Sequence, residues 1–76
     1  MHTRRGWVEI TDGRFEITWW HQRGTDRLYV ARPDGTRVGW WDVQAQCAHA
    51  DRRPDTSVVV GAIDKWLAGQ SVARMR

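Results

Sequence analysis

One cysteine and three histidines are the residues of this 76-residue chain best suited to bond-making chemistry. Cys47 and His49 lie two positions apart in the stretch CAH, while His2 and His21 lie elsewhere. A zinc site needs about four ligands, usually in closely spaced pairs such as CxxC or HxxxH, and the chain has no such pair. Cys47 and His49 could form a nucleophile pair, but no oxyanion donor or orienting group accompanies them. We therefore predict no metal site, no cofactor and no catalytic centre.

The carboxylates have positions typical of structural roles. Aspartates at turns and helix ends accept hydrogen bonds from nearby backbone N–H groups. The chain has seven aspartates, and they mostly fall at such positions: Asp12, Asp26, Asp34, Asp42, Asp51, Asp55 and Asp64. A cross-strand pair between Asp42 and Arg27 is one expected contact. The chain has no glycine-rich phosphate loop and no pair of catalytic acids, which favours a protein that is not an enzyme.

Arginine and tryptophan are the most abundant side chains that could bind a partner. The chain has eleven arginines, one lysine and six tryptophans, with a net charge of +3 and a pI near 10.0. A basic balance attracts polyanions, so nucleic acid is a predicted class of partner. A preference for arginine is also typical of a GC-rich genome, and a net charge of this size is normal for solubility. Charge by itself therefore favours nucleic acid only modestly.

Alternating apolar and polar residues between positions 7 and 44 predict four strands. The runs WVEITDGRFEITWW and RLYVARPDGTRVGWWDV each contain two strands around a turn. Asp12-Gly13 supplies the first turn, and Pro33, Asp34 and Gly35 supply the second. Residues 21 to 26 form a polar connection between the two hairpins. Short connections place consecutive strands side by side, so the sequence predicts an antiparallel meander.

The segment PDTSVVVGAIDKWLAGQ predicts a C-terminal helix. Asp55 or Thr56 is the expected N-cap, and Gly69 the expected C-terminal stop. An apolar stripe at helical spacing consists of Val59, Ile63, Trp66 and Leu67. Residues 45 to 54 fit either a short edge strand or an irregular crossing, and residues 1 to 6 and 71 to 76 are expected to fray. The prediction is a single α+β domain over residues 1 to 76, with a meander of three to five strands and one C-terminal helix packed on one face.

The two tryptophan pairs decide what the other face of the sheet carries. Successive side chains of a strand point to opposite faces, so neither Trp19 and Trp20 nor Trp40 and Trp41 can share a side. The apolar alternation places Trp19 and Trp40 under the helix. The open face then carries Arg14, Trp20, Arg27, Tyr29, Arg37 and Trp41. A bulge near Gly39 would reverse the fourth strand and put Trp41 inside and Trp40 outside.

The open face is the predicted binding site. Arginine can clamp phosphates while aromatic rings stack on bases, so the first reading is a nucleic-acid-binding module with DNA favoured over RNA. The alternative is a protein-interaction or homodimerisation module in which the same rings are the buried anchors of an interface. A solvated face, with Glu9 and Glu16 paired to arginines across the strands, explains the pattern without any partner.

The chain has no predicted membrane span, and its basic N-terminal segment is not followed by the apolar run of a signal peptide. A single cysteine gives no internal disulfide and is typical of a reducing compartment. We therefore expect a cytoplasmic protein without a membrane partner.

Three short motifs resemble a known module. DRLYV at residues 26 to 30, DGT at 34 to 36 and GWWD at 39 to 42 are followed by a helix containing IDKWLAG. In this combination the chain resembles a small module of actinobacterial proteins that often precedes a nuclease-related (NERD) domain. The resemblance implies a sheet-plus-helix module that accompanies nucleic-acid-processing proteins, and it implies no catalytic residue. A looser architectural likeness is to the plant ethylene-response and phage-integrase arm-binding domains, which place a three-stranded sheet in the DNA major groove.

Overall fold

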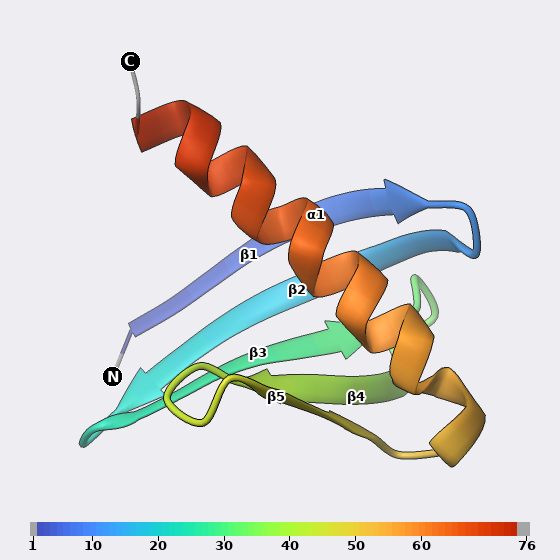
Figure 1. The fold of residues 1–76 in the computed structure, drawn as a ribbon, viewed down its shortest axis with the longest axis horizontal. Helices are drawn as coiled ribbons and strands as arrows, with labels where there is room; N and C mark the ends of the chain where they lie inside the picture. The colour runs from blue at the N-terminus through green and yellow to red at the C-terminus, as the bar shows by residue number, and fades with distance from the viewer. Residues whose placement is uncertain (1, 75–76) are drawn as a thin grey trace.

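The computed structural model describes the backbone of residues 2–74 and the side chains of residues 4–69. Five strands form one antiparallel sheet in sequence order, and a helix crosses one of its faces (Figure 1). The elements are β1 (His2–Ile10), β2 (Gly13–Gln22), β3 (Thr25–Ala31), β4 (Arg37–Asp42), β5 (Cys47–Ala50), a 3₁₀ turn η1 (Arg53–Asp55) and α1 (Thr56–Arg74). The predicted α+β meander with a C-terminal helix is therefore confirmed.

Tight turns join the first three strands. Thr11 and Asp12 connect β1 to β2. Arg23 and Gly24 connect β2 to β3 with positive φ angles of 48° and 79°, which match the twist of the flanking strands. Residues 21, 22, 25 and 26, expected in a polar connection, are therefore paired strand residues at Gln22↔Thr25 and His21↔Asp26. The sheet is longer at this end than the sequence predicted.

The last strand settles the question left open for residues 45 to 54. Cys47–Ala50 pairs with β4 as an edge strand, and the following residues turn through η1 into the helix. Asp42 Oδ1 accepts a hydrogen bond from the backbone N–H of Ala45 at 3.0 Å, which holds the loop before β5. Ala48 and Ala50 pack against the core on the helix side.

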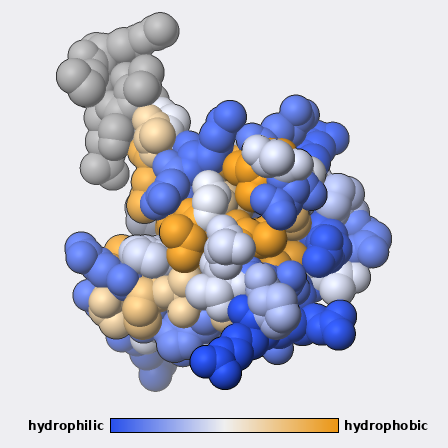
Figure 2. Space-filling model, turned by 45° about the vertical axis from the view of Figure 1, so that its right-hand side comes forward, coloured by the Kyte–Doolittle hydropathy of each residue, from blue (hydrophilic) through white to orange (hydrophobic). Residues whose placement is uncertain are grey.

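The core lies between α1 and one face of the sheet. Its buried side chains are Val8, Phe15, Ile17, Leu28, Val30, Val38, Val59, Ala62 and Ile63. From the predicted helix stripe, Val59 and Ile63 are buried and Trp66 packs against the core, but Leu67 is 42% exposed. Val60 is also 36% exposed, and orange apolar side chains are visible among blue hydrophilic ones in Figure 2. The helix therefore leaves part of its apolar surface uncovered.

Two glycines of the sheet have no room for a side chain. A Cβ at Gly39 would overlap the carbonyl oxygen of His49 and lie 2.8 Å from Val59 Cγ2. A Cβ at Gly6 would overlap the ring of Trp66. Because neither glycine has a side chain, the backbone of β5 and Val59 of α1 lie close to Gly39, and the Trp66 ring packs against Gly6 of β1.

The described residues near both ends of the chain are more regular than expected. β1 begins at His2 and pairs with β2 along its whole length, so residues 2–6 are not frayed. The helix continues through Gly69 to Arg74, where the sequence predicted a stop and a frayed tail, and residues 75–76 lie outside the described part. At its start the Thr56 hydroxyl donates to the carbonyl of Arg53 at 2.9 Å instead of capping an N–H. Among residues 2–74, α1 is not apolar enough over its length to cross a membrane.

Candidate interaction face

A bulge in β4 decides which tryptophan faces the helix. Val30 pairs with Gly39, but Ala31 pairs with Arg37, so Val38 is an extra residue on β4. Beyond the bulge Leu28 pairs with Trp41, and Trp41 packs against the core. The first prediction for the fourth strand, with Trp40 inside and Trp41 on the binding face, is therefore wrong. The alternative with a bulge near Gly39 is confirmed.

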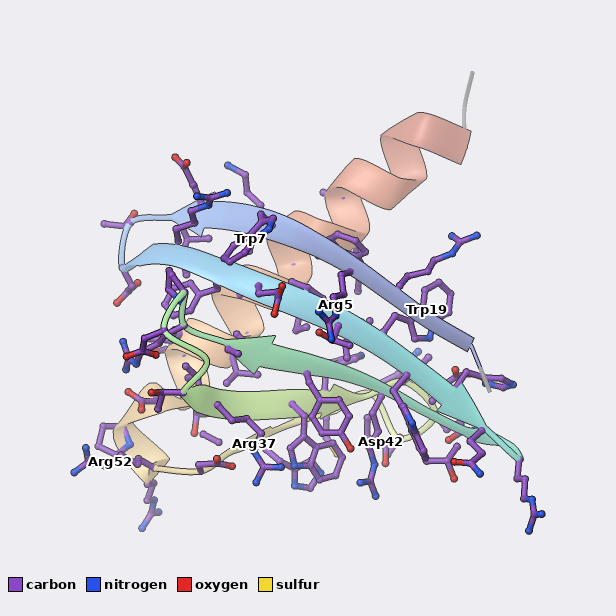
Figure 3. The ribbon with its side chains drawn as sticks, turned by 180° about the vertical axis from the view of Figure 1, so that it is seen from behind. Arg5, Trp7, Trp19, Arg37, Asp42 and Arg52 are labelled. Atoms are coloured by element: carbon purple, nitrogen blue, oxygen red, sulfur yellow. The ribbon has the colours of Figure 1, made fainter. Side chains whose placement is uncertain are left out.

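The open face is the side of the sheet opposite α1, and Figure 3 views the molecule from that side. The strand register aligns one row of side chains across all five strands: Arg5, Thr18, Tyr29, Trp40 and His49. A second row contains Trp20 of β2, Arg27 of β3 and Asp42 of β4. Arginine and aromatic residues from different strands therefore meet at the centre of this face.

A stack of three side chains occupies the β3 to β5 side of the open face. The Arg27 guanidinium carbon lies 4.2 Å from the centre of the Trp40 ring. The His49 ring stacks on Trp40 with 4.0 Å between centroids and 13° between planes. Since β3 and β5 flank β4 on opposite sides, these two groups reach Trp40 from opposite sides. Both faces of the Trp40 ring are therefore occupied within the protein itself.

Tyr29 lies beside this stack and contacts Arg27. Arg27 Nη1 donates to the Tyr29 hydroxyl at 3.2 Å, and the Tyr29 ring lies 6.4 Å from Trp40 at 45°. The Nε of Arg27 is buried without a hydrogen-bond partner among the described residues. Arg27 and Asp42 are opposite each other as predicted, but the described ion pairs do not join them. The guanidinium lies against rings instead of a carboxylate.

Trp7 forms a second arginine and ring contact near the other edge. Arg14 lies with its guanidinium carbon 4.3 Å from the centre of the Trp7 ring. Glu9 is opposite Arg14 in the register, yet the arginine lies over the ring. Trp7 is still 45% exposed, more than any other large apolar side chain described. It is therefore the ring of this face with the most surface left for a partner.

Arg37 makes the one arginine to carboxylate pair found among residues 4–69. Its Nε donates to Asp51 Oδ2 at 2.9 Å, and both groups are partly exposed. The hydrogen bond and the charge of Asp51 raise the pKa of Arg37. An arginine held in this way is less free to bind a phosphate than the sequence prediction required.

The charges of the open face cancel. Among the described side chains, its four arginines are Arg5, Arg14, Arg27 and Arg37. Its four carboxylates are Glu9, Glu16, Asp42 and Asp51. These eight described charged side chains of the open face therefore sum to zero.

The far end of the helix face holds a small polar network. Trp19 Nε1 donates to Asp26 Oδ1 at 3.1 Å, and His21 Nδ1 lies 2.7 Å from the same oxygen. The hydrogen bond from Trp19, followed by the hydrogen bond and charge of His21, lowers the pKa of Asp26 below its ordinary value. Arg4 adds a weaker contact, 5.9 Å from the Trp19 ring centre. These contacts position the end of the core and do not face the open side.

Cys47 and His49 both lie on the open face, because β5 is a strand and residues two apart on a strand share a side. The Cys47 Sγ lies 3.3 Å from His49 Nε2, and both side chains are exposed. Within the described residues no group of three His, Cys, Asp or Glu side chains could hold a metal ion. The imidazole ring also stacks on Trp40, so His49 contributes to the aromatic stack.

Five of the six predicted site residues lie on the open face: Arg14, Trp20, Arg27, Tyr29 and Arg37. Trp41, the sixth, lies on the opposite face of the sheet, which the helix covers. The sequence prediction did not include Trp40 or His49 in the site. For Trp40 the available signal was Gly39, whose position in the strand allowed a bulge. For His49 it was the alternation of alanine with Cys47 and His49, which is typical of a strand with a small inner face.

Comparisons of the chain with protein-family models, with curated proteins and with solved structures give no match.

Proposed function

We propose that the protein is a non-enzymatic protein-interaction module that binds its partner with the open face of the sheet. The observation that carries this proposal is the composition of that face: arginine and aromatic side chains at its centre with a net charge of zero. Trp, Tyr and Arg are the residue types that most often supply the binding energy of protein interfaces. The proposed location is the cytoplasm, because a free, exposed thiol such as Cys47 is typical of a reducing compartment.

The arrangement of the rings supports a protein partner over stacked bases. Trp40 already has Arg27 on one side and His49 on the other. A base could stack on Trp40 only after one of these groups moved, whereas the edges of a preformed stack can pack against another protein without rearrangement. Side chains fixed before binding also lose less conformational entropy on association.

Nucleic-acid binding is the second candidate, and two arginines favour it. Neither Arg5 nor Arg27 is in an ion pair within residues 4–69, and Arg27 Nε has no acceptor there. A phosphate could accept from these guanidinium groups. The four carboxylates on the same face oppose this, because the affinity for nucleic acid comes mainly from neutralised phosphates.

Binding assays at two salt concentrations separate these candidates. Labelled duplex DNA and single-stranded RNA are titrated with the protein at about 50 and 200 mM salt, the range over which phosphate-based affinity falls steeply. In parallel, immobilised protein captures partners from an extract of the cells that produce it, and mass spectrometry identifies them. We expect no salt-sensitive oligonucleotide binding, and we expect capture of a protein that persists at high salt.

The control is a pair of single substitutions. Tyr29→Ala removes a ring from the centre of the open face, and Asp34→Ala changes an exposed residue in the turn between β3 and β4. The captured protein should bind the Asp34 variant and not the Tyr29 variant, and the purified partner should reproduce this difference. Tight oligonucleotide binding that weakens with salt, or equal capture by both variants, contradicts the proposal.

A further inference from the structure

The edge strand β1 is the longest unpaired strand edge of the sheet. It has nine residues and pairs only with β2, whereas the opposite edge strand, β5, has four. An exposed edge offers a row of backbone N–H and C=O groups to which another strand can pair. The edge carries no proline, the residue that most directly prevents such pairing.

The phase of the β1–β2 ladder fixes which backbone groups point outward. A two-residue turn joins the strands, so the flanking pair Ile10 and Gly13 is a hydrogen-bonded pair. Alternate residues then bond to β2, and the residues between them direct their N–H and C=O groups away from the sheet. Arg5, Trp7 and Glu9 belong to this outward set.

The same three residues have exposed side chains on the open face. Their order is cation, ring, anion, centred on Trp7. An antiparallel copy of this strand presents the order in reverse, so Arg5 meets Glu9 of the copy, Glu9 meets Arg5, and Trp7 meets Trp7. This charge pattern is complementary to itself.

We propose that two copies of this chain associate through β1, antiparallel and around a twofold axis at Trp7. Each Arg5 then lies opposite Glu9 of the other copy, and the two Trp7 rings meet at the axis. A register shifted by two residues places Arg5 opposite Trp7 and leaves Glu9 without a cation. Complementary charge therefore selects the register centred on Trp7.

The helix is positioned for the same assembly. Trp66 packs on Gly6 of β1, and α1 then continues to Arg74 beyond this edge of the sheet (Figure 1). A twofold axis perpendicular to the sheet keeps both helices on the same side, so the first strand of the second copy lies next to this overhanging part. In this register Gly6 is opposite Val8 of the copy, which places small and apolar groups beneath the helices.

This association does not depend on the proposed function, because it uses the edge of β1 and leaves the centre of the open face free. Two open faces would join into one continuous sheet surface. The dimer could therefore exist whether that surface binds a protein or a nucleic acid, and loss of one property leaves the other measurable.

Charge reversal tests the register. Sedimentation equilibrium across protein concentrations should show a monomer–dimer equilibrium for the wild type. Arg5→Glu and Glu9→Arg each create two like-charge pairs and should raise the dimer dissociation constant about tenfold or more. An equimolar mixture should form a heterodimer, since each interface then has two opposite-charge pairs. Arg32→Glu, the same change on an exposed turn, should leave the equilibrium unchanged.

A symmetric disulfide tests the axis. In a Cys47→Ser background, Trp7→Cys places two thiols in one hydrogen-bonded pair, where the Cα separation of about 5.5 Å fits a disulfide. Mild oxidation should crosslink this variant and leave the matched Asp34→Cys variant without an intermolecular disulfide, as non-reducing electrophoresis would show. A wild type that remains monomeric at all concentrations overturns the proposal. A dimer insensitive to both charge reversals, or a mixture that stays monomeric, overturns it as well.

Discussion

The two faces of the sheet are built by different interactions from neighbouring residues of the same strands. Under α1, the buried side chains described are all apolar. On the open face, arginines lie against rings, as Arg27 does on Trp40 and Arg14 on Trp7. The helix face is stabilised by removal of apolar surface from water, while each exposed cation and ring contact contributes only about 0.5–1 kcal/mol. Fold stability therefore depends mainly on one set of alternate positions along each strand, and the proposed recognition would use the other set.

Ile17 and Thr18 give the sharpest contrast between the faces. Ile17 is 0% exposed beneath the helix, and Thr18 is next to it on the open face. Ile17→Ala should lower the free energy of unfolding by about 2–5 kcal/mol, enough to unfold much of so small a protein. Thr18→Ala should cost less than about 1 kcal/mol. Urea denaturation followed by tryptophan fluorescence measures both values, and similar losses would refute the division between the faces.

Gly39 tests how closely β5 and the helix must pack around β4. Gly39→Ala introduces a methyl group against the backbone of β5, which cannot move as a side chain can, and should cost up to about 3 kcal/mol. Gly69→Ala has open space within α1 and should instead stabilise the protein by about 0.5–1 kcal/mol. The midpoint temperature of thermal denaturation should fall for Gly39→Ala and rise for Gly69→Ala. A shift of the same sign in both would mean that the close approach at Gly39 is not essential.

The second tryptophan pair separates stability from binding. Trp41→Ala removes a ring that packs on the core and should lower the unfolding free energy by about 2 kcal/mol. Trp40→Ala removes a ring stacked only by Arg27 and His49, so it should cost about 1 kcal/mol or less. Partner capture should be lost in the Trp40 variant, which remains folded. A larger stability loss for Trp40 than for Trp41 would reverse the assignment of the two faces.

The smallest expected effect is the pH dependence that comes from Asp26. Because Trp19 and His21 lower its pKa in the folded protein, ionised Asp26 stabilises the fold above its ordinary pKa near 3.8. This contribution is lost as the pH falls through the lower, folded-state value. The difference in stability between the wild type and Asp26→Asn should therefore shrink between about pH 5 and pH 2. Urea titrations across this range measure it, and a difference independent of pH would exclude the ionised network.

The sequence predicted the architecture better than the orientation of one strand. Turn residues and alternation were enough for the meander, and helical spacing was enough for α1. The orientation of Trp40 and Trp41 depended on the single extra residue Val38, because one inserted residue reverses every later side chain on a strand. Because glycine has no side chain, the residue type of Gly39 does not indicate which face of the sheet it belongs to. Its pairing with the core residue Val30 and its contact with Val59 of a distant helix show that it lies inside.

The rest of the candidate site depended on contacts between strands. Arg14 and Arg37 were placed on the open face by alternation, but their partners were not predicted. Local sequence does not specify whether an arginine lies on a ring or a carboxylate when both are within reach. Leu67 was expected to be buried because helical spacing gives the face of a residue without giving the width of the sheet beneath it.

The contact between Gly6 and Trp66 has a consequence for folding. These residues are sixty positions apart, so the first strand gains its cover only from an element made at the other end of the chain. While the polypeptide is being synthesised, the strands emerge before the helix, and their apolar face stays exposed to water until the helix has formed. Such long loop closure slows folding and leaves nascent chains open to aggregation. Chaperone dependence during translation should therefore be greater than the size of the protein suggests.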